Sequence, residues 1–159
     1  MRLSLVEIVL FALAAAVAVT ALPRCSGGGP RHASVRARWD LTPGVLSAAV
    51  TQATIDQTIC RPGWTKTVRP PTTYTNDLKR RGLAQYGLRG PPSAFQEDHL
   101  ISLELGGDPT DPRNLWPEPY PRATAVDRIE NELNRRVCTR SLSLAEAQVR
   151  ESALKHAVG

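Results

Sequence analysis

The stretch that decides the fold is FQEDHLISLELGGDPTDPRNLWPEPYPRATAVDRIENELNRRV, residues 95–137. Residues 95–103 alternate apolar and polar side chains, as a half-buried strand does, and residues 104–113 are rich in Gly, Pro and Asp, as loops are. Asn114–Trp116 predicts a second short strand, which the next proline ends. Apolar residues then recur at helical spacing over 123–137. The sequence therefore predicts strand, long loop, strand and helix, in that order.

The flanking segments complete a loop-rich α+β domain. A threonine cap and a closing glycine predict a helix over 76–86. The capping box Ser143-Leu144-Ala145-Glu146 predicts a last helix that runs to about His156. Prolines in residues 61–74 favour an extended, irregular segment, with neither a helix nor a central strand. Residues 51–60 predict a short strand or a turn.

The amino-terminal region has the composition of an export signal. Residues 8–22 are almost wholly apolar, which suits a signal peptide and is short for a membrane span. We expect residues 1–24 to be a signal peptide or an uncleaved membrane anchor, residues 25–38 a flexible linker, and residues 39–159 the folded domain. A lipoprotein interpretation of the cysteine in the linker is disfavoured by the arginine before it. Either way we expect a secreted or membrane-anchored, extracytoplasmic protein.

The chain has three cysteines, Cys25, Cys60 and Cys138. Disulfides persist outside the cytoplasm. Cys25 lies beside the leader and a glycine-rich stretch, so Cys60 and Cys138 form the expected disulfide. The alternative is a pair of buried free thiols. If it forms, the bridge encloses the region that carries the predicted chemistry.

The net charge of +5 conceals two opposed blocks. Residues 61–96 hold seven Lys and Arg against one Asp, whereas residues 97–132 hold nine acids against three Arg. Much of the remaining positive charge lies before residue 39. The acidic block suits a bound cation, and the basic block suits a phosphate backbone. The hydrophobic share of 42% excludes a disordered or collagen-like chain.

Five polar residues lie at the key points of the strand–loop–strand–helix segment. Asp98 and His99 are adjacent on the first strand, so their side chains point to opposite faces. Asn114 opens the second strand. Asp127 and Asn131 are four residues apart on the helix and share a face. These residue types in this order predict a site in which a base and a cation act on one substrate from different directions.

Three short motifs carry a resemblance to a known family. Asp98-His99-Leu100-Ile101, Leu105-Gly106-Gly107 and Arg113-Asn114-Leu115-Trp116 resemble the HNH, or His-Me finger, endonucleases, whose core is a ββα-metal unit. This resemblance covers about residues 95–137, roughly a quarter of the chain. The phrase EDHLISLELGGDPTDPRNLWPE is also similar to exported bacterial proteins with an HNH-like domain, a likeness that extends to Cys60, Trp64 and the YTNDLKRR stretch.

The resemblance implies a role for each residue of the site. His99 would be the general base that takes a proton from water, and Asn114 would orient it by a hydrogen bond. Asp98 would bind a divalent metal ion, Mg²⁺, Mn²⁺ or Ca²⁺, for which carboxylate oxygen is a suitable donor. Asp127 and Asn131 are both available to complete the metal site. The implied activity is metal-dependent phosphodiester hydrolysis of DNA or RNA.

The phosphate-binding residues are expected among the basic side chains. Arg113 stands next to Asn114 and its guanidinium matches phosphate oxygens. Lys79 and Arg80 belong to the basic block. For these two the alternative is charge that only complements a helix dipole.

Two other functions remain open. The predicted helix lacks the histidine that the nuclease motif usually has, and the domain is near neutral, which favours a non-catalytic exported envelope or binding protein. The third alternative is a phosphodiesterase for small molecules or the cell wall. We expect nucleic acid as partner, a membrane contact only through an uncleaved amino-terminal segment, and no obligate protein partner.

Overall fold

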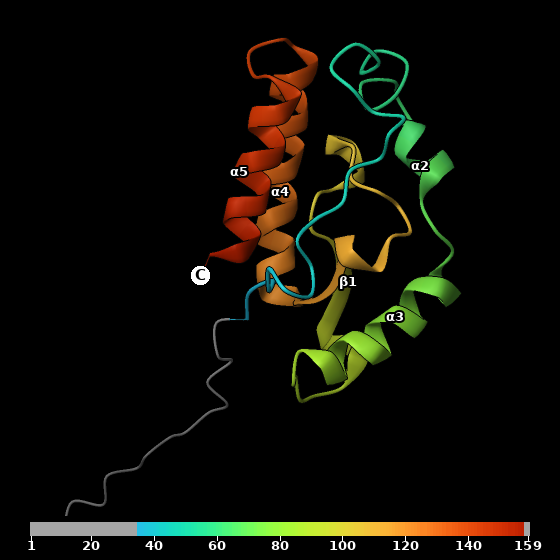
Figure 1. The fold of residues 1–159 in the computed structure, drawn as a ribbon, viewed down its shortest axis with the longest axis vertical. Helices are drawn as coiled ribbons and strands as arrows, with labels where there is room; N and C mark the ends of the chain where they lie inside the picture. Colours follow the sequence, from blue (N-terminus) through green and yellow to red (C-terminus); the bar gives the residue numbers. More distant parts are fainter. Residues whose placement is uncertain (1–34, 158–159) are drawn as a thin grey trace, which may run out of the picture. The chain divides into compact units, whose positions relative to one another are not determined.

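The computed structural model describes residues 35–157 (Figure 1). The predicted leader and most of the predicted linker, with Cys25, lie outside the described residues. Among the described residues, no helix is long and apolar enough to cross a membrane. The regular elements, in chain order, are α2 (Trp64–Val68), α3 (Thr72–Gln85), η1 (Pro92–Ala94), β1 (Phe95–His99), η2 (Leu103–Leu105), η3 (Pro112–Asn114), β2 (Leu115–Pro119), α4 (Tyr120–Cys138) and α5 (Leu144–His156).

A two-stranded antiparallel sheet lies at the centre of the predicted site. Strand β1 pairs with β2 in a register that sets Asp98 opposite Trp116 and His99 opposite Leu115. The prediction that a proline ends the second strand is wrong, because β2 contains Pro117 and Pro119. Each strand of a two-stranded sheet has one edge that pairs with no other strand. Two prolines that are two residues apart can both direct their backbone nitrogens to this free edge, where no N–H is needed for pairing. The mixed α+β class is confirmed.

Helix α4 begins where the strand ends. It starts at Tyr120, three residues before the predicted start, with Pro121 in its first turn. Proline is tolerated there because the first N–H groups of a helix have no partner inside the helix. Helix α5 follows the predicted capping box, in which the Ser143 side chain accepts from the Glu146 N–H. The two long helices lie side by side in Figure 1.

The prediction of an irregular segment over residues 61–74 is wrong in part. Helix α2 occupies five residues of it, and α3 begins at Thr72, directly after Pro71. Prolines precede helix α3 and do not interrupt it. Helix α3 packs closely on β2, since a Cβ on Gly82 would lie 3.0 Å from Pro117 Cδ. The turn alternative is correct for residues 51–60.

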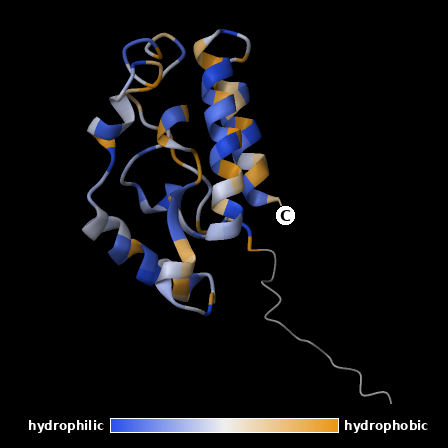
Figure 2. Ribbon diagram, turned by 180° about the vertical axis from the view of Figure 1, so that it is seen from behind, coloured by the Kyte–Doolittle hydropathy of each residue, from blue (hydrophilic) through white to orange (hydrophobic). Residues whose placement is uncertain are grey.

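The main core joins α4 and α5 to the loops before them. Figure 2 shows hydrophobic residues interspersed with hydrophilic ones along both helices, as in amphipathic helices. The buried members of this core are Val50, Ile55, Ile59, Ile101, Leu105, Leu133, Val137, Leu142, Leu144 and Ala147. The core therefore holds the loop after β1 against the helix that carries Asp127 and Asn131.

The folded domain begins before the expected residue 39. Ala37 is 2% exposed, and its N–H donates to the Lys155 carbonyl at 3.0 Å. The ring of Trp39 stacks on His156 with centroids 3.5 Å apart. The last residues of the predicted linker therefore pack against the end of α5.

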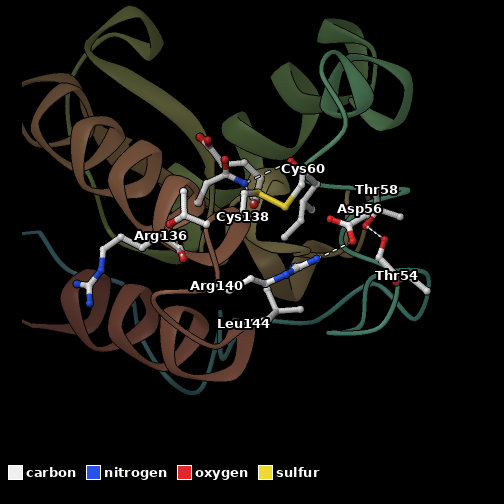
Figure 3. Close-up of a disulfide and its surroundings, with 12 residues drawn as sticks. Thr54, Asp56, Thr58, Cys60, Arg136, Cys138, Arg140 and Leu144 are labelled. Atoms are coloured by element: carbon white, nitrogen blue, oxygen red, sulfur yellow. Dashed lines mark hydrogen bonds and ion pairs between the residues drawn. A yellow bond between two sulfur atoms is a disulfide. The ribbon is translucent and has the colours of Figure 1, made fainter.

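The predicted disulfide between Cys60 and Cys138 is present, with Cα atoms 5.5 Å apart (Figure 3). It joins the turns before α2 to the end of α4. Beside it, Arg140 donates to Asp56 at 2.6 Å, a second link between the same two segments. The presence of the disulfide is compatible with a secreted protein.

Candidate functional site

A cavity of about 420 Å³ lies between β1, η2 and α4, with residues from the α2 region at its rim. Four of the predicted residues, Asp98, His99, Asp127 and Asn131, all line it. The complete lining is Thr65, Arg69, Gln96, Asp98, His99, Ser102, Leu103, Glu104, Asp127, Glu130 and Asn131. The strand and the helix therefore bring together the side chains that the sequence predicted to act as one site.

His99 is held in one orientation. Its Nε2 lies 3.1 Å from the carbonyl oxygen of Pro109, which can only accept, so Nε2 carries the proton. In the neutral ring Nδ1 is then the nitrogen that can take a proton. His99 is 6% exposed, and this burial lowers its pKa below the ordinary value. At neutral pH His99 is therefore neutral and able to act as a base.

Asn114 acts on the loop and not on the imidazole. Its amide accepts from the Ile101 N–H at 3.0 Å and donates to the Ile101 carbonyl at 3.0 Å and the Asp108 carbonyl at 2.9 Å. The prediction of a direct hydrogen bond to His99 is corrected by these contacts. Asn114 holds the loop that presents Pro109, and the Pro109 carbonyl orients His99.

The Gly-Gly pair of the motif has a steric cause. A Cβ on Gly107 would lie 1.8 Å from the Ile101 carbonyl oxygen and 2.6 Å from Asn114 Nδ2. Gly106 has φ of +81°, in the left-handed region that favours glycine. Only glycine at position 107 allows the loop to close around Asn114. The motif therefore helps to place the loop whose Pro109 carbonyl orients His99.

Asp98 is paired with a lysine from the last helix. Lys155 is fully buried, and its Nζ lies 2.7 Å from Asp98 Oδ2, 2.5 Å from Glu130 Oε1 and 3.5 Å from Glu151 Oε1. It also donates to the His99 carbonyl. Burial alone would raise the pKa of Asp98, but Lys155 together with Glu118 and His99 outweighs it, and the pKa is lowered. Asp98 is therefore ionised at neutral pH.

The wall formed by α4 and η2 gathers carboxyl groups whose pKa values are raised. Burial, and then the charges of Glu130 and Asp127, raise the pKa of Glu104 to about 7. Burial and the charge of Asp98 raise the pKa of Asp127. Asn131 donates from its amide nitrogen to the Asp127 carbonyl at 2.7 Å, which leaves its amide oxygen as an acceptor. This wall of the cavity therefore favours a positively charged or proton-donating ligand.

The carboxylates do not, as placed, form a ready-made metal centre. Over residues 35–157, no three His, Cys, Asp or Glu side chains are grouped so that they could hold a metal ion. Both oxygens of Asp98 already accept hydrogen bonds, one from Lys155 at 2.7 Å and the other from Gln96 at 3.2 Å. Metal binding by Asp98, Asp127 and Asn131 therefore stays a prediction.

The three predicted phosphate-binding residues lie outside this cavity. Arg113 pairs with Asp111 at 2.6 Å, Arg80 pairs with Asp77, and Lys79 donates to the Phe95 carbonyl at 3.0 Å. The cavity instead receives Arg69, just after α2. Within the described part of the chain Arg69 has no ion pair. Its charge nevertheless lowers the pKa values of the cavity residues His99, Glu104 and Asp127.

Sequence reasoning missed Arg69 and Lys155. Arg69 precedes two prolines, and its only signal was membership of the basic block. The signal for Lys155 was weaker still, because it is separated from Asp98 by 57 residues. Glu118, for which spacing predicted no role, is fully buried and accepts from Arg122 at 2.5 Å.

Comparison of the chain with models of protein families, with curated proteins and with solved structures found no match.

Proposed function

We propose that this protein is a phosphodiesterase of the HNH, or His-Me finger, type, which hydrolyses nucleic acid outside the cytoplasm. One observation carries the proposal. Asp98 and His99 on β1 and Asp127 and Asn131 on α4 line one cavity, together with Arg69. The order β1, long loop, β2 and α4 is the order that a ββα-metal core requires.

The side chains of the cavity supply a route for hydrolysis. Nδ1 of His99 takes the proton of a water molecule while the water oxygen bonds to phosphorus. The bond from phosphorus to the leaving oxygen breaks, and that oxygen takes a proton from solvent. Nε2 stays bonded to the Pro109 carbonyl, so the ring keeps its orientation. Arg69 offers a planar pair of donors to the phosphate oxygens that gain charge in the transition state.

Metal dependence is a separate part of the proposal. The resemblance implies Mg²⁺, Mn²⁺ or Ca²⁺, with donors from Asp98, Asp127 and Asn131. Calorimetric titration with each ion tests it directly, and Asn131→Ala and Asp127→Asn are the variants to compare. A titration that shows no heat of binding for any of the ions would contradict metal dependence and leave the role of His99 untouched.

The decisive test of the activity is hydrolysis by the purified domain. We expect the wild-type protein with Mg²⁺ or Mn²⁺ to cleave plasmid DNA or RNA, and His99→Ala to lose about 10²–10⁴-fold in rate, the usual contribution of a general base. Circular dichroism shows whether the variant is folded. If wild type and His99→Ala cleave equally, or neither cleaves, the nuclease proposal fails.

Two substitutions at Arg69 test its role in binding phosphate. Arg69→Lys keeps the charge but loses the two-pronged geometry, whereas Arg69→Gln loses both. We expect the rate to fall in the order wild type, lysine variant, glutamine variant. Arg80→Gln is the control, because Arg80 is an exposed residue outside the cavity, paired with Asp77.

A non-catalytic binding protein is the second candidate, and one observation favours it. The cavity carboxylates Asp98 and Glu130 are partly neutralised from inside, since Lys155 Nζ lies 2.7 Å from the first and 2.5 Å from the second. A scaffold that had lost its chemistry would keep such an internal pair for stability alone. Retained ligand binding with no hydrolysis, in both wild type and His99→Ala, would support this candidate.

A further inference from the structure

The candidate active-site cavity continues into a second one. The second cavity has a volume of about 450 Å³ and shares Thr65 and Glu104 with the first. Its lining is Ile59, Cys60, Arg61, Pro62, Gly63, Thr65, Glu104, Asn134, Arg135, Cys138 and Thr139. The two cavities therefore adjoin each other at Thr65 and Glu104, and together, from His99 to the disulfide, we call them the groove.

The groove has basic side chains in both of its halves. Arg69 lies in the first cavity, and Arg61 and Arg135 lie in the second. In the part of the chain that the structure describes, Arg61 has no ion pair. Arg135 pairs with Glu132 at 2.6 Å, and both side chains are more than half exposed. An exposed pair of this kind contributes little, so Arg135 can exchange Glu132 for a phosphate.

The walls of the second cavity are held in place. The disulfide ties Cys60, next to Arg61, to Cys138, three residues after Arg135, as Figure 3 shows for the two cysteines. The Asn134 amide donates to the Glu104 carbonyl at 2.7 Å and to the Ile59 carbonyl at 3.4 Å. The two arginines are therefore presented from segments that are fixed to each other, which suits a preorganised binding site.

A phosphodiester with a single phosphate needs only the first cavity. A polymer strand carries further phosphates, and its next phosphates must lie along the groove. Each cavity has the volume of a pocket for one small molecule, so the groove suits a flexible strand more than a duplex. We propose that Arg61 and Arg135 bind a phosphate adjacent to the one that is cleaved, and that the substrate is single-stranded nucleic acid. The part of this inference that concerns cleavage rests on the proposed function, whereas strand binding by Arg61 and Arg135 does not.

The charge of Glu104 provides a further test of strand binding in the groove. Its carboxyl group lines both cavities and stands where the strand crosses from one to the other. The pKa of Glu104 is raised to about 7, so above this pH it carries a negative charge that opposes a phosphate backbone. Above pH 7, Glu104→Gln is therefore expected to bind the strand more tightly, whereas Arg61→Gln and Arg135→Gln bind it more weakly.

The experiment measures binding apart from cleavage. Every protein carries His99→Ala, so that a fluorescent oligonucleotide of about 12 nucleotides stays intact during an anisotropy titration over a range of salt concentrations. Removing the contacts to one phosphate of a single strand is expected to lower the slope of log K against log salt by about 0.7. Arg61→Gln/Arg135→Gln should show this loss, and Arg150→Gln, an exposed arginine outside both cavities, should not.

Four outcomes would overturn the inference. Equal losses in the double variant and in Arg150→Gln would mean binding to basic surface in general. Tighter binding of a duplex of the same length would exclude a single-strand groove, and no binding by the parent protein would exclude the groove altogether. Cleavage of nucleic acid by the wild type with no effect of Arg61 and Arg135 would leave the proposed function standing without the groove. Binding that depends on Arg61 and Arg135, without any cleavage by the wild type, would support the groove and contradict the proposed function.

Discussion

The ammonium group of Lys155 lies 2.7 Å from the carboxylate of Asp98, in the interior of the protein and across 57 residues of chain. The same ammonium group donates to the backbone carbonyl of His99. The last helix therefore fixes both residues of the Asp-His pair, one through its side chain and one through its backbone. The position of the candidate base depends on a residue far from the motif that contains it.

Replacing Lys155 by Met is expected to destabilise the protein by about 3–5 kcal/mol, because it leaves buried carboxylates without their counter-charge. Chemical denaturation measures the change. The control is Arg80→Gln, which breaks an exposed pair and should cost less than about 1 kcal/mol. Similar losses for both variants would show that the buried pair contributes no more than a surface pair.

The pH dependence of hydrolysis should report the environment of His99. Burial lowers its pKa below 6.5, so the ring stays neutral to a lower pH than an exposed histidine. Activity is present above the folded pKa and is lost as the pH falls through it. We therefore expect the acid limb of the rate profile to have its midpoint below 6.5. A midpoint above 6.5 would show that His99 is not the group that titrates.

Gly107→Ala is expected to disrupt the loop that supports His99. The new methyl group would overlap the Ile101 carbonyl and crowd the Asn114 amide, so that backbone must move. Gly63→Ala is the comparison, because a Cβ there meets no atom within 4 Å and carries only the cost of a positive φ, about 1–2 kcal/mol. Thermal unfolding should place Gly107→Ala well below Gly63→Ala. Equal melting temperatures would contradict the steric role of the Gly-Gly motif.

Sequence signals within a few residues predicted the elements that such short segments determine by themselves. The capping box at Ser143 and the helical period before Val137 gave α5 and α4 within a few residues, and the cysteine count gave the disulfide. The prolines near helix α2 and in strand β2 predict an irregular segment and an early strand end, and the structure contradicts both. In the structure they lie at helix starts and on a free strand edge, where proline is allowed.

The candidate site was predictable only where its residues lie in one segment. Asp98, His99, Asp127 and Asn131 come from residues 95–137, and the order of the elements brings them to one cavity. Arg69 and Lys155 enter from segments on either side, and their approach depends on how α2 and α5 pack. Tertiary packing has no local signature, so charge alone could not single them out.

The disulfide is expected to matter for stability and for the groove. It closes a loop of 78 residues, for which loop-closure entropy gives about 4 kcal/mol. We expect Cys60→Ser/Cys138→Ser to lose stability of this order in chemical denaturation. In the His99→Ala background it should also bind the oligonucleotide with a smaller salt slope, because Arg61 is no longer tied beside Arg135. A reducing agent should have the same effect on the parent protein and none on the serine variant. If the serine variant loses stability but keeps the full salt slope, the disulfide stabilises the fold without organising the groove.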